Sequence, residues 1–215
     1  MASSYKAVAN SEWNDSFSLA TNVPTKKGTL AFGVVRLGDD IFSQQVSSLG
    51  VANRFGLASL GVKINYTSYN VKGLGTKSVP SIDFGGIAEL APDILVGAYI
   101  RNLNQAKLSE VEDERLPTLM NVGLSYRPTD HVMLNLEVEK DIDFSPSFKA
   151  GIDYAVIKNI NLRTGINTNP DSQYMGMGIT PNNIKLQFDY AWSNTRYWGS
   201  GHQVSLVYQF PSKKK

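Results

Sequence analysis

The stretch Ile184-Lys185-Leu186-Gln187-Phe188-Asp189-Tyr190-Ala191-Trp192 decides the fold class of this chain. Its even-numbered residues are all large apolar or aromatic residues, and its odd-numbered residues are Lys, Gln, Asp and Ala. Successive side chains of a β-strand point to opposite faces of the sheet. The stretch therefore predicts a strand with one apolar face and one polar face.

The same alternation recurs along the chain, for example at 59–67, 132–139, 160–167 and 203–210. It predicts thirteen strands, near 12–21, 28–37, 43–54, 57–70, 79–90, 93–103, 118–127, 131–140, 146–157, 160–168, 172–180, 183–193 and 201–210. Continuous helical periodicity is missing, and no domain boundary appears. Strands of this length suit a tilted crossing of a bilayer, which takes about 9–11 residues.

The composition narrows the class of protein. A chain of 215 residues with 42% apolar residues has no run near the roughly 18 consecutive apolar residues that a transmembrane helix needs. The net charge is only +2 and the charged residues are scattered along the chain, so no nucleic-acid surface is expected. Cysteine is absent, which excludes disulfides, thiol catalysis and thiolate metal sites. His131 and His202 lie at a turn and at a strand start, so no histidine-rich metal site is expected.

The connections between the predicted strands alternate in length from residue 55 onward. Tight turns at 55–56, 91–92, 128–130, 158–159 and 181–182 alternate with longer links at 71–78, 104–117, 141–145, 169–171 and 194–200. Outer-membrane barrels have short periplasmic turns and longer outer loops. The pattern therefore predicts an all-β antiparallel meander, a transmembrane β-barrel of about 12–14 strands.

The N-terminus suggests that part of the barrel is missing. Single-chain bacterial barrels normally have an even number of strands, and thirteen is odd. We therefore divide the chain into an N-terminal segment at 1–11, a barrel at 12–210 and a basic C-terminal tail at 211–215. No secretory signal is visible. We expect the native protein to carry additional N-terminal residues, at least a strand and a signal peptide.

The alternation also assigns side chains to the two faces of the barrel. The lumen-facing candidates are Lys63, Asp83, Glu89, Arg101, Arg127, Glu137, Glu139, Lys149, Asp153, Arg163, Lys185 and Asp189. The lipid-facing candidates are Leu60, Val62, Ile64, Leu134, Leu136, Ile184, Leu186, Phe188 and Leu206. Six cations balance six anions in the lumen, which favours ion pairs between neighbouring strands. A channel selective for one sign of charge stays open as an alternative.

No motif indicates catalysis. His202 follows Ser200 without a nucleophile elbow or a third triad member. Glu137 and Glu139 are two carboxylates on one face, and we interpret them as structural neighbours on a lumen wall. The acidic stretch 109–115 is expected to be a solvated outer loop. We predict no catalytic residues, no cofactor and no metal.

The end of the chain carries a further signal. Tyr208-Gln209-Phe210 resembles the terminal signal that barrel-assembly machinery reads in outer-membrane proteins, although Pro211 and four further residues follow it.

Short motifs resemble the PorV/PorQ family. Asp189-Tyr190-Ala191, then Gly199, His202, Ser205-Leu206 and Phe210, look like the closing hairpin of that family. Pro117 with 123–128, 60–63 with Tyr66, and 101–103 match in order too. The resemblance implies a fourteen-stranded barrel of the fatty-acid-transporter FadL type, and some relatives act in type IX protein secretion. The family's usual N-terminal segment, with a signal and an Asn-Pro-Ala motif, has no counterpart here.

Three functional hypotheses remain at this point. The first is a non-enzymatic barrel of the Gram-negative outer membrane that serves secretion or cell-surface assembly through contacts with secretion-machinery proteins or secreted cargo. The second is a FadL-like passive transporter of small hydrophobic molecules. The third is a soluble β-sandwich or barrel binding module, which would have to pack its apolar faces against a second sheet.

Overall fold

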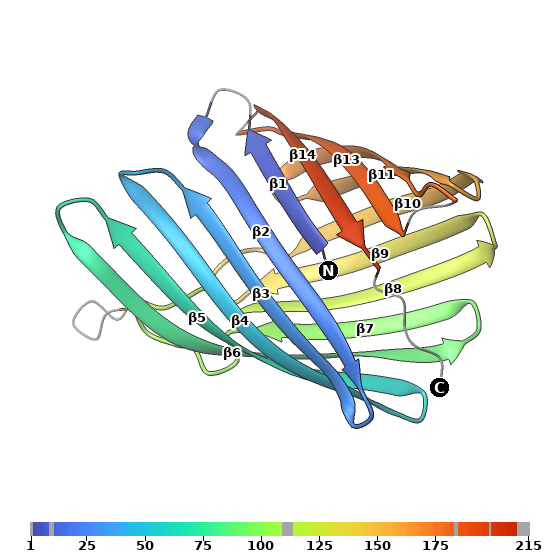
Figure 1. Cartoon of the computed structure of the whole chain (residues 1–215), viewed down its shortest axis with the longest axis horizontal. Coiled ribbons are helices and arrows are strands. Elements are labelled where there is room, and N and C mark those ends of the chain that lie inside the picture. Colours follow the sequence, from blue (N-terminus) through green and yellow to red (C-terminus); the bar gives the residue numbers. More distant parts are fainter. Residues whose placement is uncertain (1, 9–10, 109–113, 183–184, 198, 210–215) are drawn as a thin grey trace.

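The computed structural model describes residues 2–8, 11–108, 114–182, 185–197 and 199–209. These residues form fourteen β-strands, shown in Figure 1. Their bounds are β1 Ala2–Val8, β2 Ser11–Thr25, β3 Gly28–Gly38, β4 Phe42–Phe55, β5 Ala58–Val71, β6 Gly75–Ala91, β7 Ile94–Arg101, β8 Leu119–Thr129, β9 Val132–Asp141, β10 Ser147–Ile157, β11 Ile160–Thr168, β12 Asp171–Ile179, β13 Leu186–Thr195 and β14 Gly199–Tyr208. The described residues contain no helix of the length and apolarity that crossing a membrane requires.

The strands form one closed antiparallel barrel. Each strand pairs with its neighbours in the sequence, and β1 pairs with both β2 and β14 (Figure 1). Closure pairs the backbone groups of the first and last strands, which an open sheet would leave as exposed edges. The predicted all-β antiparallel meander is confirmed.

The expectation that the barrel lacks an N-terminal strand is wrong. Residues that we assigned to an N-terminal segment form β1, whose register with β14 runs from Ala2 opposite Val207 to Val8 opposite Gly201. The sequence concealed this strand because Ala, Ser and Val dominate it and the contrast between its two faces is weak. The strand that completes an even number therefore lies at 2–8.

The antiparallel order divides the connections between two rims. One rim carries the connections at 39–41, 72–74, 102–118, 142–146, 169–170 and 196–198, and we call it the long-loop rim. The other carries those at 26–27, 56–57, 92–93, 130–131, 158–159 and 180–185, and we call it the short-turn rim. We predicted that the connections at 104–117 and 128–130 lie on opposite rims, and this prediction is confirmed. The link predicted at 71–78 is shorter, because β5 and β6 stay paired to Val71 opposite Gly75.

The β3–β4 turn on the long-loop rim is organised by one carboxylate. The backbone N–H groups of Phe42 and Ile41 donate to Asp39 Oδ1 at 2.9 and 2.8 Å. These two hydrogen bonds stabilise the charged form and lower the pKa of the Asp39 carboxyl. The turn residue Gly38 has a φ of 98°, and a Cβ there would lie 2.2 Å from the carbonyl oxygen of Phe42. This position therefore requires glycine.

The two faces of the barrel wall differ in chemistry. The outer face carries large apolar side chains that are exposed, such as Val62, Ile64, Val122 and Leu136. The inner face carries small and polar residues. Among the described residues, the buried apolar side chains are Val79, Ala106 and Leu116 alone. The barrel is thus held by strand pairing and inner-face polar contacts, since its apolar residues mostly lie outside.

Candidate functional site in the barrel lumen

Eight of the twelve predicted lumen residues make ion pairs with one another on the inner face. Registers place Lys63 opposite Asp83, Glu137 opposite Lys149, and Asp153 opposite Arg163. The cross-strand pairing that the charge balance suggested is therefore present, in three separate clusters.

The first cluster joins β8, β9 and β10. Lys149 Nζ lies 2.8 Å from Glu137 Oε1 and 2.9 Å from Glu139 Oε2. Asn121 Nδ2 donates to the same two oxygens, at 2.8 and 2.9 Å. The two carboxylates thus share one ammonium and one amide. This arrangement fits their interpretation as structural neighbours.

The second cluster joins β10, β11 and β13. Arg163 Nε lies 2.7 Å from Asp153 Oδ2, and Arg163 Nη1 lies 2.7 Å from Asp189 Oδ1. Gln187 Nε2 donates to both oxygens of Asp189. Arg163 therefore links strands that are not adjacent in the barrel, because β12 runs between β11 and β13.

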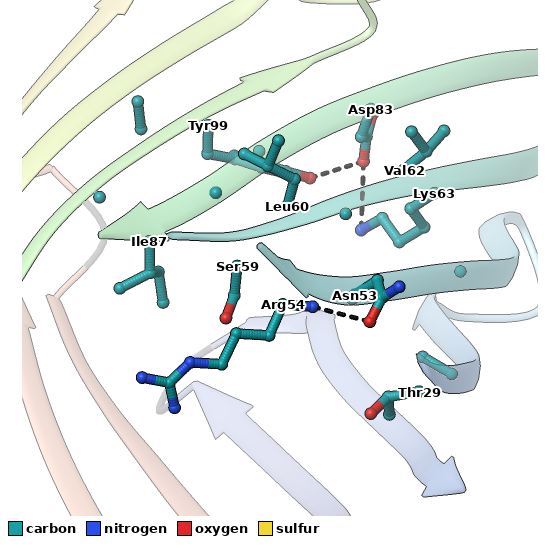
Figure 2. Close-up of a pocket in the computed structure, with 18 of the residues that line it drawn as sticks. Thr29, Asn53, Arg54, Ser59, Leu60, Val62, Lys63, Asp83, Ile87 and Tyr99 are labelled. Atoms are coloured by element: carbon teal, nitrogen blue, oxygen red, sulfur yellow. Dashed lines mark hydrogen bonds and ion pairs between the residues drawn. The ribbon is translucent and has the colours of Figure 1, made fainter. Parts of the chain in front are cut away.

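The third cluster surrounds Asp83 on β6, which is 1% exposed. Tyr99 Oη donates to Asp83 Oδ2 at 2.5 Å, and Lys63 Nζ lies 3.1 Å from the same oxygen. The backbone N–H of Asn102 donates to Asp83 Oδ1 at 2.9 Å. Figure 2 shows Tyr99 and Lys63 converging on this carboxylate. A buried carboxylate needs such partners.

The other four lumen candidates lie toward the rims, outside these clusters. Glu89 pairs with Arg54, whose Nη2 lies 3.3 Å from Glu89 Oε2, and both side chains are well exposed. Arg127 donates to Met133 Sδ. Arg101 ends β7 and is exposed, and Lys185 precedes β13 and is outside a strand.

The predicted lipid-facing residues are mostly exposed in the barrel. Those with more than a third of their surface exposed are Leu60, Val62, Ile64, Leu134, Leu136, Phe188 and Leu206. Leu186 is half-buried at the start of β13, and Ile184 lies outside the described residues. Contact of these side chains with lipid stays a prediction.

The lumen contains a cavity of about 1070 Å³. Its wall includes polar side chains, such as Asn22 and Asn135, and seven inward-facing residues that are glycine or alanine: Ala31, Gly50, Ala52, Gly61, Gly85, Gly97 and Gly123. The cavity begins near the short-turn rim, where Thr25 and Lys26 border it, and extends to the Asp83 cluster. Figure 2 shows Ser59 and Ile87 on this wall, with the long Arg54 side chain beside them. The lack of side chains on the glycines is what leaves this space open.

The connection at 102–118 folds inward on both sides of the acidic stretch 109–115, for which we expected a solvated outer loop. Its residues Asn102, Ala106, Leu116 and Thr118 are buried, and Ala106 and Leu116 pack with Val79 of β6. In the acidic stretch, Glu114 and Arg115 are exposed, while 109–113 lie outside the described residues. We did not predict the inward-folded part of the loop from the sequence. It begins at Asn102, whose φ of 53° is a conformation that asparagine adopts more readily than most residues.

Two inner-face residues besides Asn102 were also missed. Tyr99 and Asn121 are not among the charged residue types, so a search for Lys, Arg, Asp and Glu side chains passed over them. Each alternates with apolar neighbours on its strand, which is the signal that could have identified them. Among the described residues, no group of three or more His, Asp or Glu side chains is arranged to hold a metal ion.

Comparison with known proteins supports the fold. No family model matches the chain, and no curated protein matches it either. The barrel is similar to the outer membrane protein Omp33 of Acinetobacter baumannii, with a TM-score of 0.61 and 6% identity over 97% of this chain and 96% of that chain. The toluene transporter TodX of Pseudomonas putida matches with a TM-score of 0.61 and 10% identity, covering 95% of this chain and 86% of that chain.

A porin has the same architecture. The KdgM porin matches with a TM-score of 0.54 and 11% identity, covering 98% of both chains. By their descriptions, the three solved structures are an outer membrane protein, a toluene transporter and a porin. At these identities the likeness establishes the barrel fold and no more. The PorV/PorQ resemblance has no matching family model behind it.

Proposed function

We propose that this chain is a non-enzymatic β-barrel of the outer membrane whose lumen passes small, largely apolar solutes passively. The observation that carries the proposal is the lumen cavity of about 1070 Å³, whose wall combines seven inward-facing glycines and alanines with the apolar side chains of Ile87 and Leu95. The glycines and alanines leave space and the apolar side chains offer contact surface, while several polar groups of the wall are already paired within the protein, as Asp83 is with Tyr99 and Lys63. The cavity therefore suits a solute with an apolar body better than a sugar or an ion.

The outer face supports a membrane location. Large apolar side chains such as Val62, Val122 and Leu136 are exposed there, and none of the described residues forms a second layer over them. Soluble proteins rarely expose apolar patches of this extent. In the closed barrel every strand has a hydrogen-bonded neighbour on both sides, so no open sheet edge faces the lipid. The alternative of a soluble binding module leaves this face unexplained.

The charges in and around the cavity support passage of an uncharged solute. Asp83 is buried and has three donors, and Glu137 is bound by Lys149 and Asn121. These carboxylates are therefore already neutralised by the protein. Of the structural relatives, TodX is described as a toluene transporter and a monoaromatic hydrocarbon channel, which agrees with an apolar solute.

The secretion role stays a prediction. It rests on the resemblance of short motifs at 60–66, 117–128 and 189–210 to the PorV/PorQ family. Contacts with secretion proteins would be made on surfaces outside the lumen. A barrel with that role would not need a solute-sized cavity, so solute flux separates the two hypotheses.

The test is flux through purified barrel refolded into liposomes. Phenyl glucoside, which has an apolar ring where sucrose has a second sugar, should enter faster than sucrose, and both rates are compared with protein-free liposomes. Gly97→Leu with Gly123→Leu should slow entry, because a Cβ at either position meets no atom closer than 3.4 Å and the added side chains fill the cavity.

The matched control adds the same kind of bulk on the outer face. Val122 lies on β8 beside Gly123, and its side chain is 58% exposed on the outer face. Val122→Leu should therefore leave the flux unchanged. Entry of phenyl glucoside no faster than into protein-free liposomes, with the barrel folded, would overturn the proposal.

A further inference from the structure

Strands β6 and β7 differ in length, so the first part of β6 pairs with β5 but has no partner on β7. β6 has 17 residues and β7 has 8, and their pairing begins at Phe84 opposite Ile100. The loop after β7 binds this part of β6 instead. Leu103 N donates to the carbonyl of Ile82 at 2.7 Å, and Ile82 N donates to Asn104 Oδ1 at 2.9 Å.

Asn102 organises the base of the loop. Its Nδ2 donates to the carbonyl of Leu116 at 2.8 Å and to Thr118 Oγ1 at 3.3 Å. Its Oδ1 accepts from Ala106 N at 2.8 Å. The one amide side chain thus joins the two described ends of the loop, 102–108 and 114–118. Asn102 is itself 1% exposed.

The loop covers a patch of the inner face. Ala106 and Leu116 pack with Val79, and Tyr69 and Leu108 lie against this cluster. The inward-facing residues of β5 and β6 that the patch contains are all 5% exposed or less: Asn65, Thr67, Val79, Ser81 and Asp83. The described part of the loop therefore lies within the barrel, against the half of β5 and β6 nearer the long-loop rim.

The same carboxylate touches both the loop and the cavity. Asp83 accepts from the backbone N–H of Asn102 on the loop side, and from Tyr99 and Lys63 on the cavity side. Asp83, Lys63 and Tyr99 are also the residues that line the inner end of the cavity. The loop therefore stands between the cavity and the long-loop rim on this side of the lumen.

We propose that the described parts of this loop, 102–108 and 114–118, act as a plug that restricts the lumen, and that Asp83 and Asn102 are the latch that holds them against β5 and β6. This inference rests on the proposed function, because a plug has a consequence only where solutes pass. The latch consists of the hydrogen bonds of Asp83 and Asn102. The buried side chains of Val79, Ala106 and Leu116 add to the contact between the loop and β6. Removing one of the latch hydrogen bonds shifts the balance between latched and released loop.

The first test releases the latch. Asn102→Gly removes the side-chain hydrogen bonds and keeps a residue that tolerates the φ of 53°. The flux of phenyl glucoside into liposomes should rise about fivefold or more, because the loss of even one of the three side-chain hydrogen bonds changes the population by about that factor. Asp83→Asn, which keeps the shape and removes the charge, should act in the same direction. Folding of each variant is checked by its heat-modifiable migration on a gel.

The second test reads the position of the loop without any flux. The chain has no cysteine, so Val79→Cys with Leu116→Cys introduces a defined pair. A short thiol cross-linker should join this pair in the folded barrel. The matched pair Val35→Cys with Leu116→Cys, in which Val35 lies on the inner face of β3, should stay unlinked. Cross-linking across Val79 and Leu116 should lower the flux, and cleavage of the linker should restore it.

The two tests separate the plug from the proposed function. An absence of flux in the wild type and in both released variants, with efficient cross-linking, contradicts passage but leaves the loop where we place it. A conducting wild type with unchanged flux in Asn102→Gly and Asp83→Asn overturns the latch. Failure of the Val79 and Leu116 pair to cross-link in a folded barrel overturns the plug itself.

Discussion

Arg163 on β11 binds Asp189 on β13 across an intervening strand, with 2.7 Å between Arg163 Nη1 and Asp189 Oδ1. The residue of β12 that lies between them is Gly178, in register with both Asn161 and Asp189. A Cβ on Gly178 would lie 2.6 Å from Asp189 Oδ1 and 3.3 Å from Arg163 Nη2. The ion pair therefore exists because the strand between its partners carries no side chain at this point.

Gly178→Ala should break this ion pair while the barrel still closes. The atoms that the new methyl group meets are the ends of side chains, so they move aside and the backbone stays in place. We expect a loss of about 1–2 kcal/mol, the lower end of the range for a charge-assisted hydrogen bond, because Arg163 is partly exposed. Urea unfolding of the purified barrel in lipid measures it.

The control for Gly178 is Gly97, another inward-facing glycine. A Cβ at Gly97 meets its nearest atoms at 3.6 and 3.7 Å, an ordinary contact. Gly97→Ala should leave stability unchanged. Equal losses of unfolding free energy for the two variants would mean that the strands need glycine for its backbone conformation and that the ion pair does not contribute to stability.

Lys149 should be needed to hold two carboxylates together. Lys149→Met leaves Glu137 and Glu139 facing each other with the Asn121 amide as their remaining shared partner. The variant should be less stable than the wild type at neutral pH by about 1–2 kcal/mol, since repulsion between like charges on one face is destabilising. Protonation of a carboxylate removes the repulsion, so the deficit should shrink as the pH falls.

Adding Glu137→Gln to Lys149→Met gives the matched test of this explanation. One carboxylate then remains, and most of the lost stability at neutral pH should return. No recovery in the double variant, measured by the same unfolding experiment, would show that Lys149 acts through packing of its aliphatic stem.

Leu136 and Leu186 should differ in their sensitivity to charge. Leu136 lies in the middle of β9 and is 58% exposed, whereas Leu186 begins β13 near the short-turn rim. Leu136→Arg should cost about 2–4 kcal/mol in lipid, and Leu186→Arg about 0–1 kcal/mol, according to their depth in the bilayer. Unfolding in liposomes measures both. A similar small cost for the two variants would contradict a transmembrane position for β9.

The strand pattern was readable because apolar outward-facing residues and polar or small inward-facing residues alternate along most strands. The stretch 184–192 shows this, although β13 begins only at Leu186 and Ile184 lies outside the described residues. The strand β1 was missed because its small residues give little contrast between faces. Parity of the strand number nevertheless required one strand before residue 12, and that strand is present at 2–8.

The site was less predictable than the fold. Charge balance indicated that lumen residues would pair, but the partners follow from register, which a single sequence does not specify across non-adjacent strands. The pair of Arg163 and Asp189 needs a glycine on the strand between them. The plug was missed because an acidic loop is usually solvated, while Asn102 and Leu116 fold inward. Their burial depends on the unequal lengths of β6 and β7.

The most direct test of the whole account is the accessibility of single spin labels along β9 in liposomes. The cysteine-free chain allows one label at a time at each position from Met133 to Glu139. Labels at Leu134, Leu136 and Val138 should meet oxygen dissolved in the lipid, and labels at Asn135 and Glu137 should be shielded from it. A period of two with even positions in lipid is the predicted result. Oxygen accessibility that lacks this period, or that is greatest at the odd positions, would contradict a barrel with its apolar face in the membrane.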